Sequence, residues 1–135
     1  YYRDTGLLIA SLDDEAQEDL RKNQNFNTYK GAIYENIIAD CFVKQGYELY
    51  YYKNEKSTIE MDFFVRDANS VVPVEVKAND NATVSLNRLI DDEKFKEIKY
   101  GIKFCNKNIG YNGKFYTFPY FCVFFLKRYI LECRI

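Results

Sequence analysis

The stretch that decides the fold is residues 59–77, which read IEMDFFVRDANSVVPVEVK. Two segments with alternating apolar residues, 59–66 and 71–77, flank the four residues DANS. Alternation with a period of two is typical of half-buried β-strands, and Asp, Asn and Ser favour turns. The stretch therefore predicts a β-hairpin with a four-residue turn. One face of its first strand is expected to carry Ile59, Met61, Phe63 and Val65.

The length of the turn fixes which residues face each other across this hairpin. Arg66 is expected opposite Val71, and the same register places Asp62 opposite Glu75. Directly opposed residues have Cβ atoms about 4.5–5.5 Å apart, and like charges at that spacing are destabilising. Apolar neighbours strengthen the repulsion, so we expect a divalent cation with oxygen ligands to hold the two acids. A register shifted by two residues would instead place Asp62 opposite Lys77, as an ordinary ion pair.

Three more charged residues are expected near these acids. Lys77 lies two positions after Glu75, so the two side chains share a strand face. We expect Lys77 to stabilise negative charge that develops on a phosphate, and exposed Glu60 to be its partner rather than a metal ligand. Glu35 lies on a predicted helix that ends near residue 44, beside an apolar stripe, so its carboxylate is expected to point toward the sheet.

Each of these features also has an ordinary structural explanation. Glu-x-Lys is common on strands, and a lone helix Glu faces solvent in most proteins. Specificity lies in the combination of a helix Glu, a strand Asp and a strand Glu-x-Lys on otherwise apolar elements. The combination predicts one site that contains Glu35, Asp62, Glu75 and Lys77.

The elements around the hairpin predict an α/β domain. A helix capped by Asn27 or Thr28 precedes a strand at residues 47–52, and a helix capped by Ser85 leads to a strand at residues 100–105. The first three strands are joined too tightly for crossovers, so they are expected to be antiparallel. The prediction is one domain over residues 1–135, with a mixed sheet, the order helix-strand-strand-strand-helix-strand, and flanking helices. Residues 120–125, YFCVFF, are expected to be buried against the sheet or a partner, or to form an interface with another domain of the longer chain.

Composition excludes several classes of function. The formal net charge is −1, so phosphate binding would have to come from a local site rather than a strongly basic surface. The chain has no histidine, which excludes Ser–His and Cys–His nucleophiles and histidine-based metal sites. Its four cysteines, Cys41, Cys105, Cys122 and Cys133, are far apart with no C-x-x-C pair, so neither a disulfide framework nor a zinc site is expected.

The chain also lacks the features of a secreted or membrane protein. No secretory signal is visible at the start. The most apolar stretch, residues 115–126, is shorter than the roughly 20 residues that span a bilayer. We therefore expect a cytoplasmic protein without a membrane partner. Because the sequence begins with Tyr1 rather than Met, we expect it to be part of a longer chain.

Four short motifs occur in a specific order along the sequence. They are DTGLL at residues 4–8, GAIYEN at 31–36, IEMDF at 59–63 and VEVK at 74–77. Together they resemble the C-terminal domain of a large group of prokaryotic AAA-type ATPases, over residues 4–119. That family carries a restriction-endonuclease-like fold of the PD-(D/E)XK type and has no settled function. The resemblance implies an N-terminal ATPase domain in the same chain.

The resemblance also implies roles for particular residues. Asp62 matches the first acidic position, Glu75 and Lys77 the acid and lysine of the second motif, and Glu35 the helix acid. Active members of the superfamily bind Mg²⁺ through such residues and through the intervening carbonyl, here that of Val76; Mn²⁺ is the expected substitute. The superfamily name would put a Pro before Asp62, and this chain has none, in a position that varies widely.

Two functions follow as expectations. The first is a Mg²⁺-dependent DNA phosphodiesterase, a nuclease domain appended to an ATPase. The second is a non-catalytic module that binds DNA or protein and regulates the attached ATPase, with a vestigial acidic site. The near-neutral net charge and the many aromatic residues favour the second slightly.

Overall fold

The computed structural model describes residues 1–24, 26–55 and 59–132. In this part of the chain the strands form one mixed sheet in the spatial order β1-β2-β3-β4-β6-β5. The strands are β1 (Tyr50–Lys53), β2 (Glu60–Arg66), β3 (Val71–Val76), β4 (Gly101–Cys105), β5 (Gly110–Tyr111) and β6 (Phe115–Pro119). Strands β1, β2 and β3 are antiparallel, β3, β4 and β6 are parallel, and β5 runs antiparallel to β6. The predicted α/β fold with a mixed sheet is confirmed.

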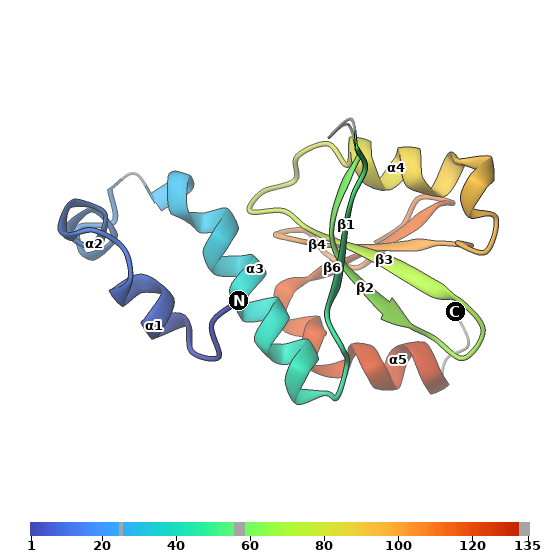
Figure 1. Cartoon of the computed structure of the whole chain (residues 1–135), viewed down its shortest axis with the longest axis horizontal. Helices are drawn as coiled ribbons and strands as arrows, with labels where there is room; N and C mark the ends of the chain where they lie inside the picture. Colours follow the sequence, from blue (N-terminus) through green and yellow to red (C-terminus); the bar gives the residue numbers. More distant parts are fainter. Residues whose placement is uncertain (25, 56–58, 133–135) are drawn as a thin grey trace.

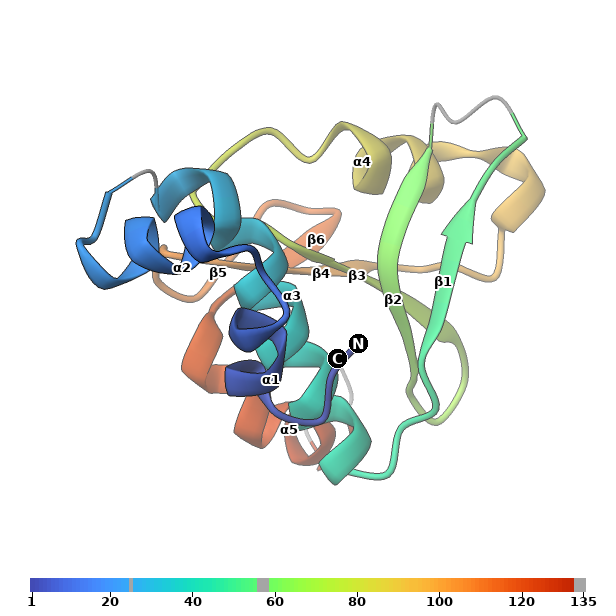
Figure 2. The same cartoon turned by 60° about the vertical axis from the view of Figure 1, so that its left-hand side comes forward.

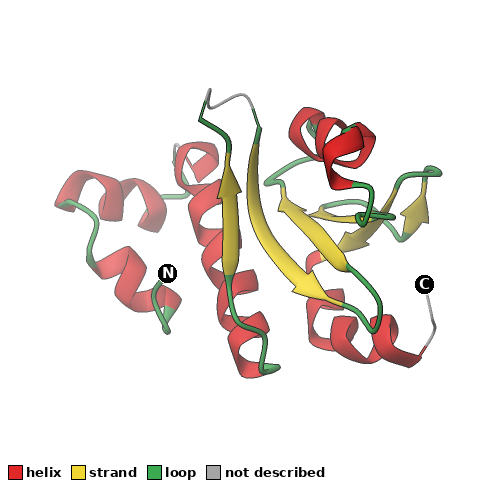
Figure 3. Cartoon of the chain, turned by 45° about the vertical axis from the view of Figure 1, so that its right-hand side comes forward, coloured by secondary structure: helices red, strands yellow, loops and turns green. Residues whose placement is uncertain are grey.

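Helices cover both faces of this sheet. They are α1 (Thr5–Ala10), α2 (Asp14–Arg21), α3 (Phe26–Lys44), α4 (Val84–Asp91) and α5 (Leu126–Glu132), with 3-10 turns η1 (Glu93–Phe95) and η2 (Tyr120–Phe125). Figures 1 and 2 show α3 and α5 on one face, α4 on the other, and α1 and α2 beside the outer part of α3. Figure 3 shows α3 running along the antiparallel strands.

Two apolar clusters form the core, one on each face of the sheet. The larger cluster joins Ile38 and Phe42 of α3 and Leu126 of α5 to the strands. The smaller one joins Leu86 and Leu89 of α4 to the opposite face. Large aliphatic and aromatic side chains supply most of the hydrophobic stabilisation of a domain this size, so the sheet is held in place from both sides.

Local sequence signals explain several element boundaries. Helix α3 ends before Gly46, whose φ of +81° is a left-handed conformation that glycine adopts at low cost. The caps predicted for α3 at Asn27 or Thr28 are side chains that lie outside the described residues. At α4 the predicted cap is wrong: Thr83 occupies the N-cap position, without a side-chain cap bond. Ser85 instead accepts a 3.5 Å hydrogen bond from the amide of Glu60 and so ties α4 to β2.

The predicted hairpin and its register are confirmed along the turn. Arg66 lies opposite Val71, and Phe63 lies opposite Val74. The Asp67 carboxylate accepts a 2.7 Å hydrogen bond from the amide of Asn69, and such local bonds are why Asp favours turns. The register shifted by two residues, with Asp62 opposite Lys77, is therefore wrong.

The predicted alternation along β2 is wrong at one point. Met61 is buried in the cluster with α4, whereas Phe63 and Val65 are buried in the cluster with α3. The pairing of β1 with β2 shifts between Tyr50 and Tyr52, as at a β-bulge, and a bulge turns the following side chains to the other face. Both sides of this sheet are apolar, so alternation in the sequence did not reveal the change of face.

Other parts of the chain also differ from the expectation. In η2 the side chain of Val123 is buried, but Phe121, Phe124 and Phe125 are each about 65% exposed. These three phenylalanines are therefore not buried against the sheet, and the alternative of an interface with a partner or another domain stays a prediction. Strand β5 is a two-residue edge strand, too short to give a hydrophobic pattern.

Membrane and cysteine features can be stated for the described residues. None of the helices described is both long and apolar enough to cross a membrane. Cys41, Cys105 and Cys122 are free thiols, and Cys133 lies outside the described residues.

Candidate functional site

Asp62, Glu75 and Lys77 lie where β2 and β3 separate, beyond the pair Phe63–Val74. Glu35 of α3 is near enough for the charges of Asp62 and Lys77 to shift its pKa. Asp62 is the residue of β2 next to Phe63, and its Oδ2 accepts a 2.7 Å hydrogen bond from the amide of Val76. The side chain thus replaces the backbone ladder at this point. Because the amide and carbonyl of one strand residue point to the same edge, the Val76 carbonyl also faces Asp62. The expected direct opposition of Asp62 and Glu75 is replaced by this side-chain contact.

Glu75 is the buried acid of the site. Its side chain is only 4% exposed, and its Oε1 lies 2.5 Å from Nζ of Lys77. Glu75 Oε2 is also buried, and it has no hydrogen-bond partner among the described residues. Buried carboxylate oxygens are nearly always bonded or ligated. Lys77 therefore satisfies half of this carboxylate and leaves the other oxygen available to a ligand.

Electrostatic repulsion remains at the site despite Lys77. Burial, and then the charge of Asp62, raise the pKa of Glu35 to about 7, although Lys77 lowers it. Burial also raises the pKa of Asp62 to about 6; the hydrogen bond from Val76 opposes this, and the charge of Glu75 adds to it. Burial is thus the larger cause of both shifts, and the charge of a neighbouring acid adds to each of them.

Glu60 was expected to be the partner of Lys77, but it has a different partner. It pairs with Lys53 at 3.3 Å, and both side chains are exposed. Glu60 lies directly opposite Lys53 in the β1–β2 ladder, whereas Lys77 is already paired with Glu75, its neighbour on the same strand face. The predicted Glu60–Lys77 pair is therefore wrong.

The donor set decides whether a divalent ion fits here. Across the described ranges, no three His, Cys, Asp or Glu side chains are grouped so that they could hold a metal ion. The predicted ligands Glu35, Asp62 and Glu75 are thus not grouped as three direct ligands, which leaves the carboxylates of Asp62 and Glu75 and the carbonyl of Val76. All of these donors are oxygen atoms, as Mg²⁺ prefers, and Mg²⁺ keeps several waters. With the unpartnered Oε2 of Glu75, the residues present fit such an ion.

The sequence analysis did not identify Lys103 or its partner Asp80, which lie near the site. Lys103 of β4 lies opposite Glu75 in the parallel ladder and is only 5% exposed. Its Nζ donates to Asp80 Oδ1 at 2.7 Å and to the carbonyl of Asn81 at 2.9 Å. A single lysine inside the apolar strand GIKFC was the signal that could have identified it. These two hydrogen bonds from Lys103 hold the loop after β3 against β4, next to Glu75.

The N-terminal segment also reaches the site. The amide of Tyr2 donates to Asn36 Oδ1 at 2.7 Å, and Asn36 is buried in α3 next to Glu35. The ring of Tyr1 lies 5.2 Å from that of Phe63. Burial, followed by the charges of Glu35 and Asp62, raises the pKa of Tyr1 to about 12. Sequence reasoning gave no signal for this contact.

The hollow beside Tyr47 and Arg66 is separate from the candidate site. A hollow of about 640 Å³ is lined by residues that include Tyr47, Tyr50 and Arg66, and none of Glu35, Asp62, Glu75 and Lys77 lines it.

One comparison with known proteins found a match, and it covers the part of the chain that contains the candidate site. A family model described as "Domain of unknown function (DUF4143)" matches residues 30–123. The match includes all four predicted site residues, Lys103 and Tyr120. No curated protein and no solved structure matches the chain.

Proposed function

The chain belongs to the DUF4143 family, and because that description gives no activity, we propose from the site itself a Mg²⁺-dependent DNA phosphodiesterase, or nuclease, domain. The observation that carries the proposal is the buried Oε2 of Glu75, which lacks a hydrogen-bond partner among the described residues and belongs to a carboxylate whose charge raises the pKa of Asp62. The motif resemblance supports a restriction-endonuclease-like PD-(D/E)XK assignment and an N-terminal ATPase domain in the same chain.

In this proposal, some residues bind the metal ion and Lys77 stabilises negative charge on the phosphate. Asp62, Glu75 and the Val76 carbonyl would hold Mg²⁺ or Mn²⁺, and Glu35, which is not grouped with the two acids as a third direct ligand, would contact the ion through water. When bound, the ion supplies charge neutralisation at the scissile phosphate and a more acidic water. Lys77, 30% exposed and paired with Glu75, can turn its ammonium toward the phosphate and stabilise the added negative charge.

Cleavage of supercoiled plasmid tests this function. Wild-type protein is expected to nick or cut plasmid with Mg²⁺ or Mn²⁺ and to lose this activity with a chelator. Lys77→Ala and Asp62→Asn are expected to lower the rate by at least about a hundredfold. Lys114→Ala and Asp91→Asn are matched controls, because Lys114 and Asp91 form an exposed ion pair away from the site. Equal cutting by wild type and both site variants would overturn the assignment.

A second candidate is a non-catalytic module that binds DNA or protein for the ATPase. Two observations favour it: Lys77 already neutralises Glu75 at 2.5 Å, and three phenylalanines of η2 are exposed. Calorimetric titration with Mn²⁺ separates the candidates. Binding that Asp62→Asn abolishes supports the metal site, whereas no heat of binding at millimolar Mn²⁺ supports the module.

A further inference from the structure

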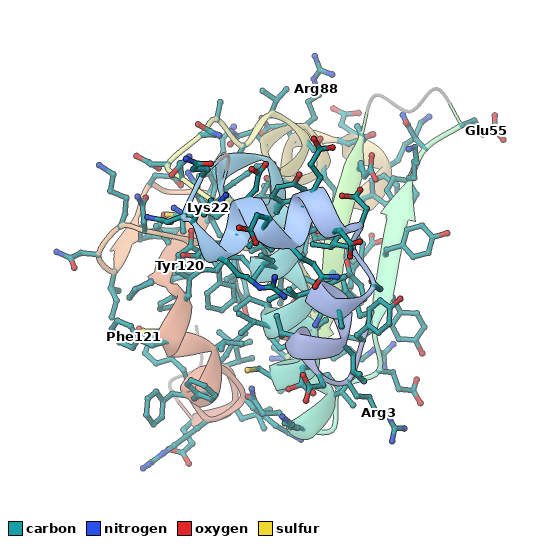
Figure 4. All side chains as sticks on the ribbon, turned by 90° about the vertical axis from the view of Figure 1, so that its left-hand side faces the viewer. Arg3, Lys22, Glu55, Arg88, Tyr120 and Phe121 are labelled. Carbon is teal, nitrogen blue, oxygen red and sulfur yellow. The ribbon has the colours of Figure 1, made fainter. Side chains whose placement is uncertain are left out.

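Tyr120 lies on η2, whereas the four candidate site residues lie on or next to α3, β2 and β3. It is the first residue of η2, and Figure 4 labels it beside its neighbour Phe121. The Tyr120 hydroxyl donates a 2.5 Å hydrogen bond to the carbonyl of Lys77, 43 residues earlier in the chain. The amide of Lys77 donates to the carbonyl of Phe104 at 2.9 Å. Both backbone polar groups of Lys77 are thus held, although β3 itself ends at Val76.

The ring of Tyr120 makes a second contact, with the helix on the other side of the site. It stacks on Tyr34 with 4.1 Å between ring centroids and 9° between planes. Tyr34 precedes Glu35 on α3, and Nζ of Lys30 lies 5.6 Å from the Tyr34 ring centroid. Tyr120 therefore touches the backbone of Lys77 and the helix that carries Glu35 at the same time.

Burial keeps the hydroxyl in the form that this contact requires. Burial, followed by the effect of Tyr34, raises the pKa of Tyr120 to about 12. The phenol is therefore protonated over the range in which proteins are assayed, and it can donate to a carbonyl throughout. Its neighbours on the same turn differ, because Phe121, Phe124 and Phe125 are mostly exposed. Tyr120 differs from these three phenylalanines in that it contacts Lys77 and Tyr34.

We propose that Tyr120 is a positioning residue of the candidate site, which fixes Lys77 relative to the α3 helix and its Glu35. The effect on cleavage rests on the proposed function, whereas the effect on Lys77 itself does not. Small displacements of a reacting group have large effects on rate, so a residue that orders the end of β3 would act on turnover rather than on substrate binding.

Tyr120→Phe isolates the hydroxyl, because phenylalanine keeps the ring that stacks on Tyr34. Tyr100→Phe is the matched control. Tyr100 is also largely buried, and its hydroxyl donates a 3.0 Å hydrogen bond to Asp67 at the far end of the hairpin. Both variants lose one tyrosine hydrogen bond, so a general loss of stability would appear in both.

Two readouts are measured on wild type and both variants. Amide hydrogen exchange by NMR reports the order of Lys77, and Tyr120→Phe is expected to speed exchange of its amide about tenfold. Plasmid cleavage with Mn²⁺ is expected to show a kcat about tenfold lower and an unchanged KM for Tyr120→Phe. Tyr100→Phe is expected to leave the Lys77 exchange rate, kcat and KM as in wild type.

The outcomes separate the two proposals. Unchanged exchange at Lys77 in Tyr120→Phe would overturn the positioning role, whatever the cleavage data show. Faster exchange, with no cleavage by wild type, supports the positioning role and overturns the nuclease proposal. Equal losses of kcat in Tyr120→Phe and Tyr100→Phe would show a general stability effect and also overturn the inference.

Discussion

The carboxylate of Asp62 caps the amide of Val76 at 2.7 Å, 14 residues along the chain, at the point where β2 and β3 separate. This contact gives the acid a structural task in addition to any ligand role. One carboxylate oxygen satisfies a strand amide that the ladder no longer pairs. The bulge against β1 places the acid here, which is a common use of bulges beside functional sites.

Substitutions of Asp62 should separate the two tasks. Asparagine keeps an oxygen that can accept from the Val76 amide, so Asp62→Asn should retain wild-type stability at pH 5 while losing metal binding. Asp62→Ala leaves the amide unpaired and should lower the free energy of unfolding by about 1–2 kcal/mol. Urea denaturation at pH 5, with Mn²⁺ calorimetry alongside, measures both effects. Equal destabilisation by Asn and Ala would contradict the capping role.

The stability of the metal-free protein should fall as pH rises. The folded-state pKa of Glu35 is about 7 and that of Asp62 about 6, both above their ordinary values. The folded chain therefore holds protons that the unfolded chain has lost between about pH 4 and pH 7, and this contribution to stability disappears as pH rises through the folded pKa values. We expect a loss on the order of 2 kcal/mol between pH 5 and pH 8, after allowance for solvent screening.

Two variations test the origin of this pH dependence. Glu35→Gln removes the group with the larger shift and should flatten the curve of unfolding free energy against pH. Millimolar Mg²⁺ should restore part of the stability at pH 8, because it binds the folded chain with its carboxylates ionised. A flat curve for the metal-free wild type would show that the carboxylates are better solvated than the structure indicates.

How far the sequence predicts this molecule depends on what each residue contacts. The turn of Asp67 and the register of Arg66 with Val71 depend on local chemistry, and both were predicted correctly. The charge effect of Asp62 on Glu35 agrees with the expectation that Glu35, beside the apolar stripe of its helix, points toward the sheet. Met61 was assigned to the wrong face because both faces of the sheet are apolar, and a bulge leaves no mark in such a pattern. Tyr120 could not be predicted, since its contacts depend on where η2 packs in three dimensions.

The ion pair between buried Lys103 and exposed Asp80 should respond asymmetrically to substitution. Lys103 is 5% exposed, whereas the Asp80 side chain is 47% exposed and its pKa is lowered chiefly by the hydrogen bond from Lys103. Asp80→Asn leaves a buried ammonium poorly compensated, and Lys103→Met leaves a carboxylate that water can solvate. Asp80→Asn should therefore lower Tm more than Lys103→Met does, as thermal unfolding followed by circular dichroism would show. The reverse order would mean that Lys103 reaches solvent.

The η2 turn should tolerate changes at its exposed aromatics and not at its buried aliphatic residue. Phe121 and Phe124 are each 65% exposed, and Val123 between them is 1% exposed in the cluster with α3 and α5. Phe121→Ser and Phe124→Ser should change the free energy of unfolding by no more than about 0.5 kcal/mol. Val123→Ala removes buried methyl groups and should cost about 1–3 kcal/mol. Urea denaturation of the three variants compares them directly, and a large loss for either serine variant would place that phenylalanine in contact with another part of the protein.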